Sequence, residues 1–124
     1  MTYLRGFLYF FGAVAIVAGA WSVVAGSESI PSAGDLNANV ESELRFYATW
    51  WIAAGVFLVW LAPRVGGQTR ALRVFCALLA LAATARVFAV IDTDWPSTGQ
   101  IILMVVEYSL AALLPLWQAR VRPA

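Results

Sequence analysis

Two charged residues, Arg86 and Glu107, lie inside stretches of the chain that are otherwise apolar. A guanidinium and a carboxylate in such places can pair with each other, bind the head group of a ligand, or move a proton. Because a charge in an apolar span is costly, it is usually paired or functional, and these two residues form the first candidate site. The chain contains no histidine, so the commonest metal ligand and general base is missing.

Other residues with chemical potential form weaker patterns. Asp92 and Asp94 flank Thr93, an arrangement that can hold a divalent cation but is more typical of a solvated turn. The one cysteine, Cys76, cannot form an internal disulfide, and its apolar neighbours indicate a small core residue. The serine and threonine hydroxyls have no histidine to activate them. We therefore expect no metal site, no cofactor and a non-enzymatic function.

The composition is typical of a membrane protein. Of the 124 residues, 62% are hydrophobic and 12% are charged, whereas a soluble domain is usually about 45–50% apolar and about 25% charged. The mean hydropathy is +0.79. The formal net charge of +1 gives no electrostatic reason to expect nucleic acid as a partner. The expected partners are membrane lipids, together with a protein partner or a second copy of the chain.

Four apolar segments are long enough to cross a bilayer as helices, since its core of about 30 Å takes about 20 helical residues. We predict a single transmembrane domain over residues 1–124, an all-α four-helix bundle with up-down-up-down topology. The predicted spans cover residues 6–25, 45–62, 71–91 and 100–118, and residues 26–44 form an outer loop rich in turn formers.

The distribution of arginines orients this bundle. If both termini lie on one side, six arginines lie there with them: Arg5, Arg64, Arg70, Arg73, Arg120 and Arg122. The opposite side receives only Arg45. Because positively charged segments stay in the cytoplasm, we predict that both termini are cytoplasmic and that the long loop faces outward.

This topology brings Arg86 and Glu107 to a similar depth. Arg86 lies six residues before Asp92, which is about 9 Å along a helix. Glu107 lies seven residues after Gln100, which is about 10.5 Å. A short turn joins the two helices, so an Arg86–Glu107 ion pair is expected in the outer half of the membrane.

The outer end of the second span adds further candidate ligand-binding residues, namely Arg45, Tyr47, Trp50 and Trp51. We expect an outward-facing cavity in which Arg86 binds the anionic head group of a small amphiphile or lipid. Glu107 would hold Arg86, and the aromatic rings would line the apolar part. The alternative is a structural ion pair that fixes helix register, with Arg86 reaching toward the interface. A second structural pair is expected between Glu41 and Arg45, four residues apart.

Two other functions fit the same pattern. The chain can be an accessory subunit of a larger membrane complex, in which the Arg86–Glu107 pair sets helix packing. It can also be a membrane isomerase of a lipid-like substrate, with Glu107 as proton donor and Trp50 or Trp51 shielding a developing cation.

Several short motifs resemble a family of small four-span bacterial membrane proteins that is catalogued as a domain of unknown function. The motifs are Glu43-Leu44-Arg45-Phe46-Tyr47-Ala48, Ala85-Arg86, Trp95-Pro96, and Glu107 followed by Leu114-Pro115. In that family a serine commonly follows the arginine by three, and a glycine commonly precedes the first proline by two. Here those positions hold Ala89 and Asp94, so no hydrogen-bonding role of that turn is carried over. The resemblance implies the fold and a location in a bacterial inner membrane, and it implies no activity.

Overall fold

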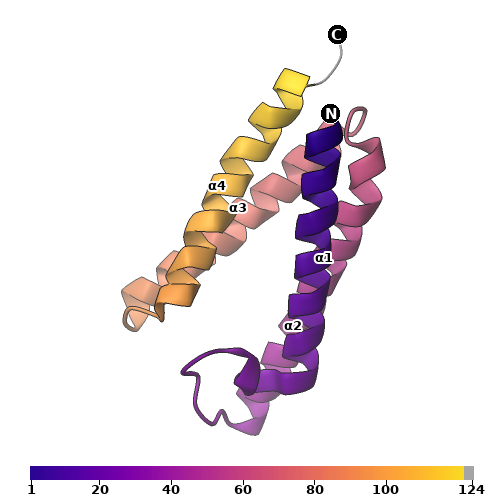
Figure 1. Cartoon of the computed structure of the whole chain (residues 1–124). Coiled ribbons are helices and arrows are strands. Elements are labelled where there is room, and N and C mark those ends of the chain that lie inside the picture. The colour runs from indigo at the N-terminus through magenta and orange to yellow at the C-terminus, as the bar shows by residue number, and fades with distance from the viewer. Residues whose placement is uncertain (122–124) are drawn as a thin grey trace. The chain divides into compact units, whose positions relative to one another are not determined.

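The computed structural model describes residues 1–121, and every regular element in that part of the chain is helical (Figure 1). Four α-helices of 24 residues each are present in this range: α1 (Thr2–Ala25), α2 (Ala38–Leu61), α3 (Thr69–Asp92) and α4 (Thr98–Val121). At 1.5 Å per residue each is about 36 Å long, which exceeds the thickness of the hydrocarbon core. All four are apolar enough to cross a membrane, so the prediction of an all-α protein with four such helices is confirmed.

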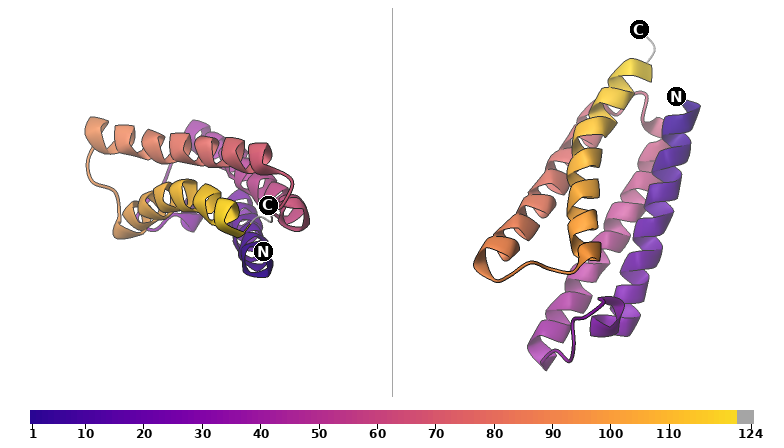
Figure 2. Two further views of the ribbon diagram at one scale, coloured as in Figure 1. Left: turned by 90° about the horizontal axis from the view of Figure 1, so that it is seen from above. Right: turned by 60° about the vertical axis from the view of Figure 1, so that its left-hand side comes forward.

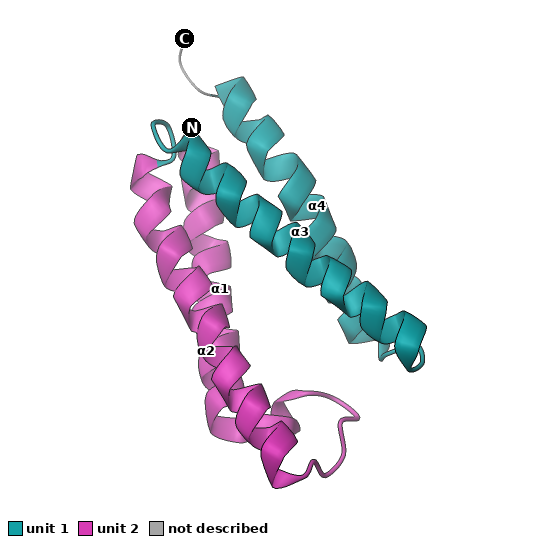
Figure 3. Ribbon diagram, turned by 180° about the vertical axis from the view of Figure 1, so that it is seen from behind, with its two compact units in different colours: residues 1, 65–124 teal, residues 2–64 magenta. Residues whose placement is uncertain are grey.

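The chain divides into two compact units, each of which is a helical hairpin (Figure 3). The first hairpin, residues 2–64, contains α1 and α2, together with the short 3-10 helices η1 (Gly26–Ser29) and η2 (Ala62–Arg64). The second hairpin begins at Val65 and contains α3 and α4. Within each hairpin the two helices run antiparallel (Figure 2), as short connections between consecutive helices require.

Small residues allow α1 and α2 to pack closely. The buried face of α1 carries Gly12, Ala15 and Gly19, and the facing part of α2 carries Ala48 and Gly55. A Cβ atom added to Gly12 would lie 2.9 Å from the Gly55 carbonyl oxygen, and one added to Gly19 would lie 2.9 Å from the Ala48 carbonyl oxygen. The two backbones therefore touch, which is how helices associate in lipid, where burying apolar side chains gains little.

Helix α2 begins at Ala38, whereas the sequence indicated a span from Arg45. The reason is Asn37, whose side-chain oxygen accepts hydrogen bonds from the backbone N–H groups of Asn39 and Val40, both at 3.1 Å. Such a cap satisfies donors that the first helical turn would otherwise leave unpaired. Since η1 also occupies Gly26–Ser29, the non-helical part of the expected loop 26–44 shrinks to residues 30–37.

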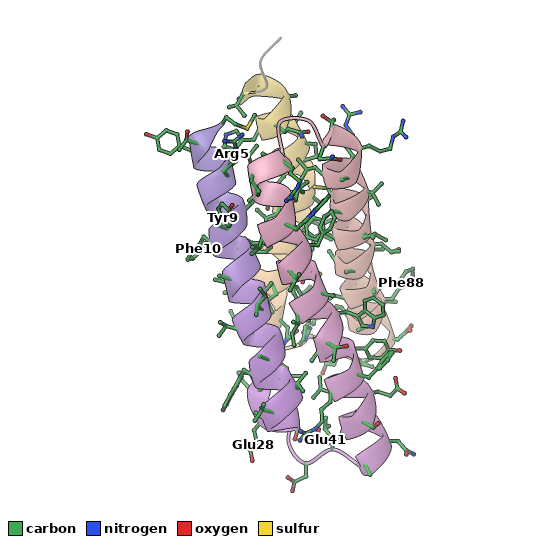
Figure 4. All side chains as sticks on the ribbon, turned by 90° about the vertical axis from the view of Figure 1, so that its right-hand side faces the viewer. Arg5, Tyr9, Phe10, Glu28, Glu41 and Phe88 are labelled. Atoms are coloured by element: carbon green, nitrogen blue, oxygen red, sulfur yellow. The ribbon has the colours of Figure 1, made fainter. Side chains whose placement is uncertain are left out.

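Two side chains of α2 close the end of α1. Both carboxylate oxygens of Glu41 accept from the backbone N–H of Ser27 at 3.1 Å. Arg45 donates to the carbonyl oxygens of Val23 and Val24, at 2.8 and 3.0 Å, and pairs with Glu41 at 3.3 Å. These contacts, the Glu41–Arg45 clasp, satisfy backbone groups that a helix end leaves open. Figure 4 shows Glu41 at the loop end of this hairpin, near Glu28.

Replacing Gly26 with alanine is expected to open this clasp. Gly26 has a φ of +58°, and a Cβ there would meet the Glu41 carboxylate and the Arg45 guanidinium. We expect a cost of about 1–2 kcal/mol for the left-handed backbone and about 1.5–3 kcal/mol more for the lost charged hydrogen bonds. Chemical unfolding in detergent micelles measures the sum.

Gly34 provides the matched control for that substitution. Its φ is +68°, and a Cβ there would meet nothing within 4 Å. Gly34→Ala should therefore lose only the backbone contribution. Equal losses of stability for Gly26→Ala and Gly34→Ala would show that the clasp contributes nothing.

In the second hairpin, α4 holds the segment that precedes α3. The side chain of Gln118 is 1% exposed, and its amide nitrogen donates to the carbonyl oxygen of Val65 at 2.5 Å. Val65 is itself fully buried. A buried amide is tolerated because it is hydrogen-bonded, so Gln118 joins one end of α4 to the start of the hairpin.

Candidate functional site

Arg86 on α3 and Glu107 on α4 form a bidentate ion pair. The Nε atom of Arg86 donates to Glu107 Oε2 and its Nη2 atom donates to Glu107 Oε1, both at 3.0 Å. The Nη1 atom donates to the side-chain oxygen of Gln100 at 2.7 Å. Two parallel charged hydrogen bonds fix the plane of the guanidinium as well as its position. The guanidinium therefore bridges two positions on α4, seven residues apart.

The two partners differ strongly in exposure. The side chain of Glu107 is 2% exposed, whereas that of Arg86 is 29% exposed. Arg86 lies six residues before the end of α3, or about 9 Å along the helix. Glu107 lies nine residues after the start of α4, or about 13.5 Å. The carboxylate is thus the buried anchor, and the guanidinium lies between it and the surface of the hairpin.

The outer edge of the Arg86 guanidinium remains open. A guanidinium has five N–H groups, and three of them have acceptors among the described residues, on Glu107 and Gln100. The other two, one on each terminal nitrogen, have no acceptor among the described residues. Guanidinium donors of this kind match the oxygens of a carboxylate or a phosphate.

A second polar contact joins the same two helices. The hydroxyl oxygens of Thr84 and Tyr108 are 2.7 Å apart. Thr84 also donates to the Ala80 carbonyl at 2.8 Å, so the Tyr108 hydroxyl is the donor in the contact between the helices. Hydrogen bonds between helices are a main source of association in lipid. The seam between α3 and α4 therefore depends on long polar side chains, whereas that between α1 and α2 depends on glycine.

The other predicted ligand-binding residues lie on α2, in the first hairpin. There each of them is either hydrogen-bonded to its own hairpin or at least partly exposed. Arg45 belongs to the Glu41–Arg45 clasp described above. Tyr47 is 60% exposed and contacts Phe46 edge to face, with ring centres 5.4 Å apart. Trp50 is 62% exposed, and Trp51 is half-buried. Because α2 begins at Ala38, Trp50 and Trp51 lie near the middle of this helix rather than at one end.

Sequence reasoning missed several polar partners of the second hairpin. Ser97 and Gln100 have the spacing of a helix-capping pair, but the side-chain oxygen of Gln100 accepts from Arg86. Neither the Thr84–Tyr108 contact nor the Gln118–Val65 bond was anticipated. The available signal was polarity alone, because a hydroxyl or amide within an apolar helix requires a partner.

Metal binding receives no support within residues 1–121, where no three histidine, cysteine or acidic side chains lie close enough to share an ion. The Asp92-Thr93-Asp94 segment forms the end of α3 and the turn that follows. There Thr93 donates to the Ala89 carbonyl at 2.6 Å, and Asp94 accepts from the Trp95 backbone at 2.7 Å. These are local turn contacts.

Four apolar helices of membrane-spanning length, with a charged pair joining two of them, define a multi-pass membrane protein. The family model described as "Domain of unknown function (DUF4345)" matches residues 3–118, and the chain belongs to this family. The prediction of a family catalogued as a domain of unknown function is confirmed. No curated protein and no solved structure matches the chain.

Proposed function

We propose that the protein binds a small amphiphile through the open edge of Arg86. The observation that supports this is the pair of N–H groups that remains after Glu107 and Gln100 are satisfied, on a side chain that is 29% exposed. Within the hydrocarbon region there is little water to accept from such donors. A head group with carboxylate or phosphate oxygens supplies the acceptors, while its apolar chain lies along the helices.

Glu107 has a positioning role in this proposal. Its buried carboxylate holds the guanidinium in one plane before the ligand arrives, so less conformational entropy is lost on binding. Both of its oxygens are occupied by Arg86. This arrangement directs both oxygens at Arg86 rather than at a substrate, so it does not favour the isomerase alternative.

The proposed location is a bacterial inner membrane with both termini in the cytoplasm. The segregation of six arginines from Arg45 supports this orientation. In it, the turn between α3 and α4 faces outward, and Arg86 lies in the outer leaflet. The ligand is then an amphiphile that reaches the outer leaflet.

The proposal is tested by native mass spectrometry of protein extracted gently from its own membrane. The variant Arg86→Leu/Glu107→Leu removes both charges together, which usually preserves a fold better than removing one. We expect the wild type to retain a small molecule and the double variant to retain at least about tenfold less, because a charged hydrogen bond contributes about 1.5–3 kcal/mol.

Tyr108→Phe serves as the control for that experiment. It removes the neighbouring hydrogen bond to Thr84 in the same hairpin but leaves the Arg86–Glu107 pair intact, so the ligand should remain bound. A wild-type protein that carries no small molecule, or a double variant that retains it fully, would contradict the proposal. A protein partner that is retained instead would support the accessory-subunit alternative.

A further inference from the structure

A groove lies between α3 and α4, toward the end of the second hairpin that is remote from its turn. Its volume is about 360 Å³. Arg73 lies at one end of the groove and Tyr108 at the other, and four alanines form much of its walls: Ala77, Ala80, Ala111 and Ala112. The methyl groups of these alanines are too short to fill the space between the helices. The groove is separate from Arg86, which is 13 residues from Arg73, or about 19.5 Å along α3.

Arg73 makes one end of this groove positive. The residue is exposed, and within residues 1–121 its guanidinium has no hydrogen bond or ion pair. The acidic residues described in this hairpin, Asp92, Asp94 and Glu107, all lie nearer to its turn. Arg70 lies one turn before Arg73, also exposed but outside the groove. The groove thus has a positively charged end, at Arg73, and an apolar remainder.

We propose that this groove is a binding site for one anionic phospholipid, in the leaflet that surrounds the start of α3. Arg73 binds the phosphate-containing head group, and one acyl chain lies along the alanines as far as Tyr108. Basic pockets between membrane helices bind anionic head groups in this way. The guanidinium is well suited to the role, because its fork of N–H groups matches phosphate oxygens.

Selectivity must come from Arg73 rather than from the apolar part of the groove. An acyl chain gains little from moving between bulk lipid and a protein groove, since both are apolar. The alanines therefore determine where the acyl chain of the lipid lies, and the charge of Arg73 determines which kind of lipid remains bound. Removing the charge should change the choice of lipid, whereas filling the groove should remove the bound lipid altogether.

Nanodiscs of phosphatidylcholine with a minor share of phosphatidylglycerol provide the test. Native mass spectrometry of the released protein counts the lipids of each kind that remain bound. We expect the wild type to retain phosphatidylglycerol in excess over its share of the bilayer. Arg73→Gln should lower this enrichment about fivefold, which corresponds to the roughly 1 kcal/mol that one arginine contributes near a membrane surface.

Two further variants make the test specific. Arg70→Gln removes the same charge one turn away and should leave most of the enrichment, because Arg70 does not line the groove. Ala112→Leu fills the groove at an exposed position without changing the charge, and should abolish retention of the lipid. Circular dichroism confirms that each variant keeps its helices.

Three results would overturn the proposal. Equal losses of enrichment for Arg73→Gln and Arg70→Gln would indicate general attraction to the charged surface. Unchanged lipid retention in Ala112→Leu would show that the groove is not the site. A dimer that Ala112→Leu dissociates, without bound phosphatidylglycerol, would assign the groove to a helix of a second copy.

Discussion

Glu107→Leu is expected to lower the free energy of unfolding of the second hairpin by about 3 kcal/mol, the lower end of the range for a buried ion pair that loses one partner. The substitution removes both acceptors that hold the Arg86 Nε and Nη2 atoms. Arginine cannot neutralise itself by losing a proton, so the charge remains within the apolar span. Its 29% exposure gives it partial access to the interface, which is why we choose the lower end of the range.

Arg86→Leu should cost less than Glu107→Leu. The carboxyl group left behind can take up a proton and become neutral, which removes most of the cost of burying a charge. The variant Arg86→Leu/Glu107→Leu should be close to the wild type in stability, because two apolar side chains suit a membrane helix better than one unpaired charge. The double variant should therefore be the most stable of the three variants, Arg86→Leu should be less stable, and Glu107→Leu should be the least stable.

Unfolding by sodium dodecyl sulfate in mixed micelles measures this double-mutant cycle, with loss of helix as the signal. A coupling energy near zero, with both single variants as stable as the double variant, would mean that the pair has no structural role. A double variant that is folded but binds no ligand would separate the proposed binding role from the structural one. The cycle thus decides between the two interpretations of the same pair.

Gly55→Leu is expected to separate α1 from α2, with a loss of about 3 kcal/mol, the upper part of the usual range for overpacking. A Cβ on Gly55 would lie 2.5 Å from the Gly12 carbonyl oxygen and 2.6 Å from the Cγ1 atom of Ile16. The first obstacle is backbone, which cannot move aside as a side chain can. Relief therefore requires the two helices to move apart along the seam.

Gly6→Leu is the matched control, since Gly6 also lies within a helix but a Cβ there would meet nothing within 4 Å. Leucine favours helix more than glycine by up to about 1 kcal/mol, so this variant should be neutral or slightly more stable. The same detergent titration measures both variants. If Gly55→Leu were as stable as Gly6→Leu, close contact between the backbones could not be what holds the first hairpin together.

The sequence was sufficient for the four helices because length and hydropathy alone determine whether a segment can cross a bilayer. Helix α2 extends seven residues before the predicted span of residues 45–62, since Asn37 caps a polar first turn that hydropathy does not detect. Arg86 and Glu107 could be proposed as neighbours because a short turn joins the two spans and residue spacing places both charges at a similar depth. The role of Gln100 depends on how far the guanidinium extends along α4, which residue spacing does not report.

Residues that face other parts of the chain were harder to predict. The pairing of Glu41 with Arg45 follows from their spacing on one helix. Their contacts to Ser27 and to the end of α1 depend on how the chain returns from α1 to α2. Gln118 and Val65 are 53 residues apart, and no local pattern connects them.

The Gln118–Val65 bond has a consequence for how the protein assembles during synthesis. The carbonyl of Val65 leaves the ribosome long before Gln118, because 53 positions separate them. Until α4 has entered the membrane, this carbonyl must accept from water, since an unsatisfied carbonyl in hydrocarbon is costly. The first hairpin has all the contacts of its own seam and clasp by then. We therefore expect the first hairpin to insert as a finished unit, and the connection between the hairpins to become buried only when α4 arrives.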